Sequence, residues 1–340
     1  MRAHSFEAEN SPMGFWKNRQ ALVTGGTGFI GSHLVEHLVA QGAKVCVVGR
    51  HVPKRWHPDP SICRAVEYFG GDLSDALFCE RACRGQEIIL HLAATVGGIG
   101  YNFPHPATLF YENVLPGVQL LHAAQRAGVE KILLVSSACV YPRDARIPTP
   151  EEDGFLQDPE EGNLGYGWGK RVLEVYGKLL VREFGMSIVI VRPYNAYGPR
   201  DDFSPVTSHV IPALFRKALE PGDELVVWGD GTPTRSFVYV EDIVHGLLLA
   251  AEQGPIADPI NLGTEEEVSI AEVAHLILEV CRVKKRLRFD PSKPGGQPRR
   301  TCDISRAIRM LRFHAEVPLR KGLQLTVNWL RKHPEVLSSS

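Results

Sequence analysis

A tyrosine and a lysine stand four residues apart in the stretch YGWGK, as Tyr166 and Lys170. On a helix this spacing places both side chains on one face. A nearby ammonium lowers the pKa of a phenol, so we expect Tyr166 to exchange a proton with a carbinol or carbonyl oxygen near neutral pH. Ser137, upstream in SSACVYP, could hydrogen-bond the same oxygen. Together the three residues favour chemistry at a carbonyl group.

The elements that would position these residues are short apolar runs alternating with helical patterns. Each run is rich in β-branched residues, and helices of 10 to 15 residues would connect them: ALVT (21–24), KVCVV (44–48), IILHLAA (88–94), KILLVSS (131–137) and SIVIVRP (187–193). Such strands are buried on both faces, so we predict an α/β fold with a doubly wound parallel sheet of the Rossmann type. Ligands then bind outside the carboxyl ends of the strands.

The pattern divides the chain into three parts. Residues 1–18 read as a flexible leader, and residues 19–194 as a dinucleotide-binding domain that receives a later strand from about 235–262. Residues 195–335 are turn-rich, with pieces such as WGDGTPTR and DPSKPGGQPRR between short helices. They predict a smaller, interleaved C-terminal lobe that holds the other reactant.

Composition excludes several classes of protein. The 340 residues are 44% apolar and 23% charged, with a net charge of −1, which gives no reason to expect nucleic acid or an acidic membrane as a partner. The seven cysteines lack paired spacing, so we expect no disulfide framework and no metal site. Without an apolar run of about 18 residues or a signal peptide, a cytoplasmic protein is expected.

The glycines of TGGTGFIGSH predict a dinucleotide site. Gly25, Gly28 and Gly31 follow the first strand and open the first helix, where a pyrophosphate could approach backbone amides that a Cβ would block. A purely structural turn is the alternative. The strand predicted before the turn and the amphipathic helix predicted after it favour a binding site.

The end of the second strand bears on the type of dinucleotide. Gly49 and Arg50 stand where an Asp or Glu would hold a ribose 2′-hydroxyl, and His51, Lys54 and Arg55 follow. Cations without an acid suit a 2′-phosphate, so NADP is favoured, with NAD possible and a solvated basic loop as the alternative.

Six segments, in order, resemble the extended short-chain dehydrogenases/reductases that act on nucleotide sugars. They are TGGTGFIG, HLAA, SSACVY, YGWGK, RPYNAYGP (192–199) and RSFVYVEDIVHG (235–246). Three further segments resemble the GDP-L-fucose synthases within that group: TVGGIGYNFPHPATLFYEN (95–113), SHVIPALFRKAL (208–219) and KPGGQPRRTCDISR (293–306).

This resemblance implies that Cys139 and His209 are an acid/base pair for epimerisation at C3 and C5. A C4 ketone acidifies the protons on both carbons, and inversion needs a base on one face of the ring and an acid on the other. A thiolate and an imidazolium can be brought near pKa 7. The alternatives are a small buried residue for Cys139 and a capping or packing residue for His209.

The resemblance also implies two sets of binding residues. Those for the cofactor are Gly25, Thr27, Gly28, Phe29, Ile30, Gly31, Arg50, Asp72, Leu73, Leu92, Ala93, Ala94, Asn113, Tyr166, Lys170, Pro193 and Asn195. Those for a GDP-sugar are Asn195, His209, Val210, Lys217, Trp228, Arg235 and Arg300. A homodimer formed through the helices that carry VQLLHAAQRAG and Tyr166 is expected as well.

Three functions follow as hypotheses. The first is NADPH-dependent 3,5-epimerisation and 4-reduction of a GDP-4-keto-6-deoxyhexose. The second is a GDP-hexose 3,5-epimerase that retains NAD(P) and oxidises C4 transiently; such epimerases usually carry a lysine in place of His209. The third is a non-catalytic dinucleotide sensor, which predicts loss of Ser137, Tyr166 or Lys170, although all three are present.

Overall fold

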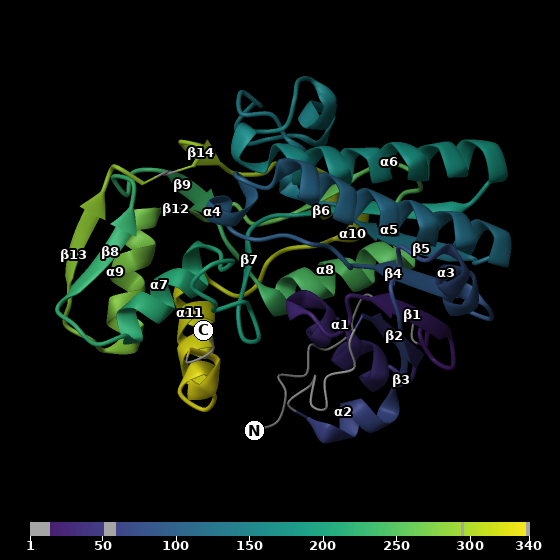
Figure 1. Ribbon diagram of the computed structural model, residues 1–340, viewed down its shortest axis with the longest axis horizontal. Coiled ribbons are helices and arrows are strands. Elements are labelled where there is room, and N and C mark those ends of the chain that lie inside the picture. Colours follow the sequence, from purple (N-terminus) through teal and green to yellow (C-terminus); the bar gives the residue numbers. More distant parts are fainter. Residues whose placement is uncertain (1–13, 51–58, 294–295, 338–340) are drawn as a thin grey trace.

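The centre of the molecule is a seven-stranded parallel sheet (Figure 1). The computed structural model describes residues 14–50, 59–293 and 296–337. In spatial order the strands are β3 (Glu67–Gly70), β2 (Lys44–Gly49), β1 (Gln20–Thr24), β4 (Ile88–His91), β5 (Lys131–Val135), β6 (Ser187–Pro193) and β11 (Ile260–Leu262). Each neighbouring pair is parallel. The predicted doubly wound sheet is therefore confirmed.

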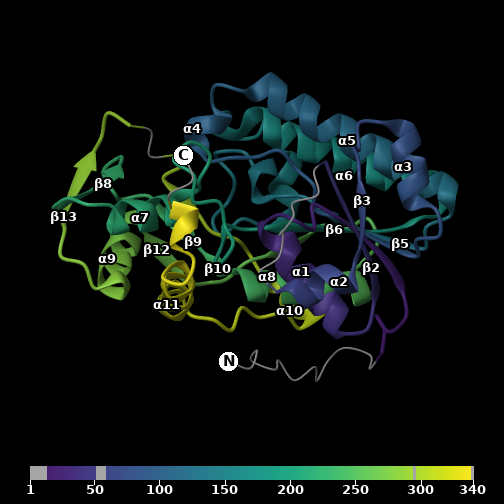
Figure 2. The same ribbon diagram turned by 60° about the horizontal axis from the view of Figure 1, so that its bottom comes forward.

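Both faces of this sheet are buried because its strands are apolar at consecutive positions. In β1, Ala21 and Val23 pack into one hydrophobic cluster and Leu22 into another on the opposite face. The first cluster is covered by α1 (Phe29–Ala40) and α8 (Val240–Gln253). The second is covered by α3 (Ala76–Cys83), α5 (Pro106–Ala127) and α6 (Leu164–Phe184), as Figures 1 and 2 show. Burial on both sides is what a continuous apolar run requires.

A second, smaller group of elements lies beside the carboxyl ends of the strands (left in Figure 1). Its strands are β7 (Ala196–Tyr197), β8 (Glu224–Trp228), β9 (Thr234–Ser236), β10 (Val238–Tyr239), β12 (Glu267–Ser269), β13 (Arg286–Asp290) and β14 (Arg299–Arg300). Its helices are α7 (Val210–Leu219), α9 (Ile270–Cys281) and α11 (Leu319–Leu330). The remaining helical pieces are α2 (Pro60–Ala65), α4 (Ile99–Asn102), α10 (Ser305–Leu311), η1 (Ala138–Val140), η2 (Glu151–Phe155), η3 (Glu161–Asn163) and η4 (Pro334–Leu337).

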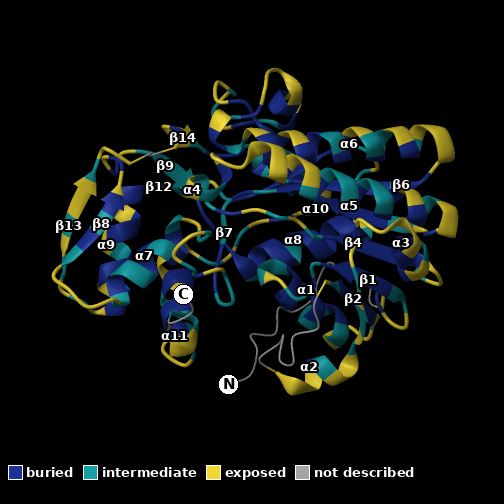
Figure 3. Ribbon diagram, viewed as in Figure 1, coloured by how far each residue is buried: buried dark blue, intermediate teal, exposed yellow. Residues whose placement is uncertain are grey.

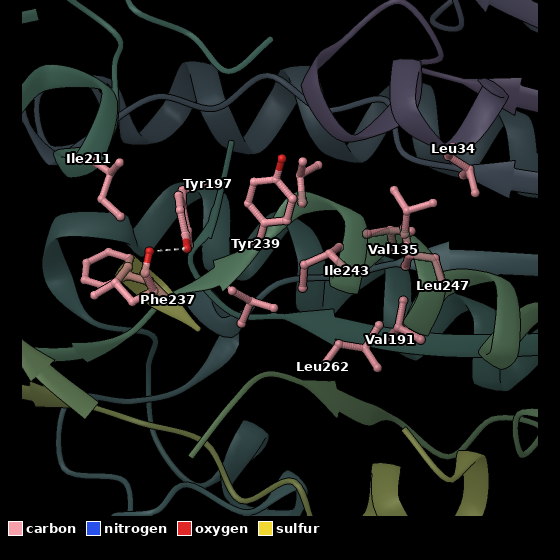
Figure 4. Packing of buried hydrophobic residues seen from close by; sticks show 14 of the residues in the cluster. Leu34, Val135, Val191, Tyr197, Ile211, Phe237, Tyr239, Ile243, Leu247 and Leu262 are labelled. Atoms are coloured by element: carbon pink, nitrogen blue, oxygen red, sulfur yellow. Dashed lines mark hydrogen bonds between the residues drawn. The ribbon is translucent and has the colours of Figure 1, made fainter. Parts of the chain in front are cut away.

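One hydrophobic core joins the sheet to this second group. Val135 and Val191, from β5 and β6, belong to the same buried cluster as Tyr197, Phe237 and Ile211 (Figure 4). The Tyr197 hydroxyl donates to the carbonyl oxygen of Leu319, at 3.2 Å. The ends of β5 and β6 and the start of α7 are therefore held by continuous packing.

The chain packs against the sheet before residue 18. Trp16 is buried, and its indole N–H donates to a carboxylate oxygen of Glu252 at 2.6 Å. The packed chain thus begins inside the expected leader, while residues 1–13 lie outside the described residues. Among the described helices, none has the length and apolarity needed to cross a membrane.

Candidate functional site

A large cavity lies at the carboxyl ends of the central strands. Its volume is about 1090 Å³, and it extends from the glycine turn after β1 to β8 and β9. It is lined by the expected Ser137, Cys139, Tyr166, Lys170, His209, Gly25, Thr27, Gly28, Phe29, Ile30, Gly31, Arg50, Asp72, Leu73, Leu92, Ala93, Ala94, Pro193, Asn195, Val210, Lys217, Trp228, Arg235 and Arg300. Thus 24 separate positions in the sequence meet around one space.

The glycine turn fits a dinucleotide pyrophosphate. Gly25 has a φ of +70°, and a Cβ there would lie 2.8 Å from the backbone nitrogen of Ala93. A Cβ on Gly31 would lie 2.1 Å from the carbonyl oxygen of Gly25. Gly28 is the N-cap of α1 and brings no side chain to the first amides of the helix. Those amides and the helix dipole therefore remain available for an anion.

Arg50 and Asp72 lie on the cavity just beyond β2 and β3. The Asp72 carboxylate accepts a hydrogen bond from the Ser74 backbone at 2.9 Å, which lowers the pKa of Asp72, and the charge of Arg50 lowers it further. A cation and a carboxylate thus face the expected adenosine end. The basic residues His51, Lys54 and Arg55 lie outside the described residues.

Asn113 does not line the cavity, in contrast to the expectation from sequence. Its side chain is buried, where Nδ2 donates to the carbonyl oxygens of Thr95 (2.8 Å) and Leu109 (2.7 Å). Its Oδ1 accepts from the Thr95 backbone at 3.1 Å. Asn113 therefore fixes the segment after β4 with an amide that is already hydrogen-bonded within the protein.

Tyr166 and Lys170 share one face of α6, as their spacing predicts. The Lys170 ammonium lies 5.6 Å from the centre of the Tyr166 ring and donates to the carbonyl oxygen of Val135 at 2.9 Å. Burial lowers the pKa of Lys170 to about 8, while Cys139 and Glu174 oppose the shift.

The pKa of Tyr166 differs in direction from the expectation. Burial raises it above the ordinary value, and Cys139 raises it further, while a hydrogen bond to Ser137 lowers it only partly. The phenol therefore keeps its proton at neutral pH. That protonation state suits a donor to a carbonyl oxygen.

Ser137 and Cys139 are placed by a single turn. Ser137 caps η1, and its Oγ accepts from the backbone N–H of Cys139 at 3.1 Å. Cys139 is partly exposed on the cavity, unlike the buried cysteines 46, 79, 83, 281 and 302. Cys139 raises the pKa of both Tyr166 and Lys170 electrostatically. Cys139 therefore faces the reacting space and does not fill the core.

His209 is the N-cap residue of α7, but its side chain makes no capping hydrogen bond. His209 is exposed on the cavity. Partial desolvation by the surrounding protein lowers the pKa of its imidazole, while Asp202 opposes the shift. The neutral imidazole is therefore favoured, whereas the sequence suggested an imidazolium. The Asp202 carboxylate accepts hydrogen bonds from the Ser204 backbone N–H, at 2.9 Å, and from the Thr207 hydroxyl.

The far end of the cavity combines an aromatic ring with cations. Trp228 is 43% exposed, with the Lys217 ammonium 5.4 Å and the Lys293 ammonium 5.9 Å from its ring centre. Arg235 and Arg300 are register partners on β9 and β14. Burial lowers the pKa of Arg235 to about 10, and Arg300 adds to the shift. Two neighbouring guanidinium groups and a partly exposed indole suit a diphosphate and a base.

Glu160 and Asn163 are cavity residues that reasoning from sequence missed. Asn163 donates to Glu160 at 2.7 Å and accepts from buried Asn102 at 2.9 Å. Glu160 also acts electrostatically on Arg235. They precede Tyr166 in an irregular stretch, so their position before α6 was the only available signal.

Comparison with known proteins agrees with this geometry. The model of the NAD dependent epimerase/dehydratase family matches residues 21–263. The chain belongs to this family. Within it, the chain is 34% identical to the dTDP-4-dehydro-6-deoxy-D-allose reductase of a Streptomyces species, over 94% of this chain and 98% of that protein.

Two further proteins are similar to this chain. GDP-L-fucose synthase of Escherichia coli K12 is 36% identical over 72% of this chain and 79% of that protein. Epimerase Mth375 of Methanothermobacter thermautotrophicus has a TM-score of 0.86 at 28% identity, covering 96% of each chain. The protein is thus an enzyme of the nucleotide-sugar epimerase/reductase type, and the resemblance seen in the sequence is confirmed.

Proposed function

We propose that the protein catalyses NADPH-dependent 3,5-epimerisation and 4-reduction of a GDP-4-keto-6-deoxyhexose. One observation carries the proposal: Cys139 and His209 line the same cavity as Ser137, Tyr166 and Lys170. A reductase alone needs only the last three. The additional thiol and imidazole supply a second proton-transfer pair where the sugar ring would lie.

The reduction uses the protonated phenol of Tyr166. The glycine turn and the first amides of α1 would hold a nicotinamide cofactor, which would supply the hydride to C4. As the carbonyl electron pair moves onto oxygen, Tyr166 gives its proton to that oxygen and a hydroxyl forms. Ser137 hydrogen-bonds Tyr166 and steadies the same oxygen, and the Lys170 ammonium stabilises the phenolate left behind.

The epimerisation uses Cys139 and His209 before the ketone is consumed. One group removes the proton from C3 or C5 to give an enolate that the C4 oxygen carries, and the other returns a proton from the opposite face. The neutral imidazole of His209 can accept a proton, and the imidazolium so formed can give one back. Each inversion moves one proton from the acid to the base overall, so both groups must return to their starting protonation states by exchange with solvent before the second inversion.

The cofactor preference is proposed from the end of β2. Arg50 lies on the cavity, and neither Gly49 nor Arg50 offers a carboxylate to a ribose 2′-hydroxyl. A guanidinium suits a 2′-phosphate. This supports NADP over NAD.

The substrate nucleotide is proposed from the far end of the cavity, within residues 195–335. Arg235 and Arg300 suit the diphosphate, and Trp228 with Lys217 suits the base. Similarity to the GDP-L-fucose synthases favours guanine. A dTDP-sugar is the second candidate, because a protein named for a dTDP-sugar matches over a larger share of the chain.

A homodimer is also proposed. α5 and α6 carry exposed apolar residues, among them Phe110, Trp168, Val175 and Leu179. Exposed positions along both helices are yellow in the ribbon of Figure 3. A second copy of this chain would cover them. Sedimentation equilibrium tests this state.

The deciding experiment incubates the protein with NADPH and GDP-4-keto-6-deoxy-D-mannose in deuterated water, with the dTDP analogue in parallel. We expect NADPH oxidation and deuterium at C3 and C5 of the GDP-sugar product, observed by NMR and mass spectrometry. Oxidation without deuterium would leave a simple reductase. Deuterium without oxidation would leave the epimerase that retains its cofactor.

A further inference from the structure

A buried ion pair lies directly behind the catalytic residues. Glu174 of α6 is 0% exposed and Arg192 of β6 is 1% exposed. Arg192 Nε and Nη2 donate to the two carboxylate oxygens of Glu174, at 2.9 and 2.6 Å. Although burial lowers the pKa of Arg192, the paired carboxylate holds it above its ordinary value. Arg192 is therefore charged at any working pH.

Both members of this pair reach the segment that carries Ser137 and Cys139. The Ser136 hydroxyl donates to Glu174 at 2.5 Å, one residue before Ser137. Arg192 Nη1 donates to the Tyr141 hydroxyl at 3.0 Å, two residues after Cys139. Both ends of the segment are thus tied to one ion pair.

The helix that carries the proton donor makes further contacts with the same segment. Tyr166, Lys170 and Glu174 recur every four residues along α6, on one face. Lys170 donates to the carbonyl oxygen of Val135 at 2.9 Å, and Arg171 Nε to that of Val140 at 2.9 Å. The distance between Tyr166 and the Ser137–Cys139 turn is therefore fixed through these bonds.

Stability alone gives a poor reason for this pair. Removing two charges from water is costly, and well-packed apolar residues often replace a buried ion pair without loss of stability. A carboxylate and a guanidinium, however, hold directed hydrogen bonds that apolar side chains cannot make. In this protein the pair provides directed hydrogen bonds to the side chains of Ser136 and Tyr141.

We propose that Glu174 and Arg192 are positioning residues, which hold the Ser137–Cys139 turn in register with Tyr166 for the reaction proposed above. Neither lines the cavity. They act through Ser136 and Tyr141, so their loss should slow both the reduction and the epimerisation. A misplacement of about 1 Å at the reacting groups can cost about 100-fold in rate. Ground-state binding should change little, because neither residue lines the cavity.

The test compares three variants with a matched control. Glu174→Leu/Arg192→Met removes both charges together and avoids a lone buried ion. Glu174→Gln keeps the shape, and Ser136→Ala removes one bond only. Leu180→Ala, at a buried apolar position of the same helix, is the control for lost stability.

We expect the double variant to fold, with kcat reduced about 10-fold to 100-fold and both KM values within about twofold of wild type. Ser136→Ala should show a smaller loss in kcat. Leu180→Ala should lower the melting temperature and leave kcat unchanged. A double variant with wild-type kcat would overturn the proposal, as would a loss confined to KM.

A second measurement needs no turnover. The rate at which iodoacetamide alkylates Cys139, followed by peptide mass spectrometry, reports the placement of the turn. We expect it to change several-fold in the double variant and not in Leu180→Ala; an unchanged rate would contradict the positioning role. If the wild-type protein turns over neither keto-sugar, the proposed function fails, and alkylation still decides the positioning role.

Discussion

Arg300 donates a hydrogen bond from Nη2 to the carbonyl oxygen of Ala138, at 2.9 Å. Ala138 lies between Ser137 and Cys139, so a cation at the far end of the cavity contacts the Ser137–Cys139 turn directly. Its register partner Arg235 instead donates to its own neighbour Thr234, at 2.7 Å. The two arginines should therefore differ in their effects on catalysis.

Replacing Arg300 by Ala should raise KM for the nucleotide sugar about tenfold or more and also lower kcat, because the turn loses a contact. Arg235→Ala is the matched comparison and should raise KM with little change in kcat. Steady-state kinetics on both variants measures the difference. Equal kcat values in the two variants would show that the bond to Ala138 is without consequence for catalysis.

Replacing Tyr166 by Phe removes the proton donor to the C4 oxygen and leaves the ring in place. Reduction should fall by about 100-fold or more, while cofactor binding persists. NADPH oxidation with the keto-sugar measures the first effect, and fluorescence titration the second. Unchanged oxidation would remove Tyr166 from the mechanism.

Replacing Cys139 by Ser keeps the size of the side chain and removes the acidic thiol. A serine hydroxyl is too weak a base for a carbon-bound proton near neutral pH, so deuterium should stop entering C3 and C5. Hydride transfer to the unepimerised ketone should continue. His209→Gln should block inversion at one or both carbons while some exchange persists.

Native-rate deuterium incorporation by Cys139→Ser would contradict this assignment. It would mean that the thiol only occupies space beside Ser137.

Replacing Arg50 by Ala should weaken NADPH binding by about 1.5 to 3 kcal/mol, the range for a hydrogen bond to a charged group. That corresponds to about 10-fold to 100-fold in affinity. NADH, which lacks the 2′-phosphate, is the internal control and should hardly change. A constant ratio of the two KM values would place the 2′-phosphate elsewhere or make NAD the natural cofactor.

Alkaline pH should reduce activity through Lys170. Its pKa is lowered to about 8 by burial, so the ammonium loses its proton as the pH rises through 8, well before an ordinary lysine near 10.5. We expect kcat/KM to fall above about pH 8. In the Lys170→Arg variant, whatever activity remains should not fall above about pH 8, because a guanidinium group stays charged there. If kcat/KM of the wild-type protein stayed constant up to pH 10, catalysis would not depend on the charge of Lys170.

The sequence predicted the elements whose pattern is local. The parallel strands were legible because β-branched runs buried on both faces have a distinct composition, and Tyr166 and Lys170 were legible because four residues make about one helical turn. Strand ends were less clear. β5 ends at Val135 and releases Ser136 and Ser137 into the turn.

What escaped prediction depends on burial and on contacts between distant segments. The pKa of Tyr166 was expected to fall because of Lys170, but surrounding protein raises it. The hydrogen bonds of the Asn113 amide to Thr95 and Leu109 were not foreseen either. Glu160 meets Arg235 only in the folded chain. None of these relationships leaves a local signature in the sequence.

The order of strands in the sheet constrains when the enzyme can be assembled. β11 is the last strand of the sheet along the chain, and Asn261 within it accepts a hydrogen bond from the Tyr141 hydroxyl at 2.6 Å. Tyr141 in turn contacts Arg192. The chain must therefore leave the ribosome as far as residue 262 before the hydrogen bonds behind the Ser137–Cys139 turn can all form. In shorter nascent chains, β6 would be an unpaired edge strand.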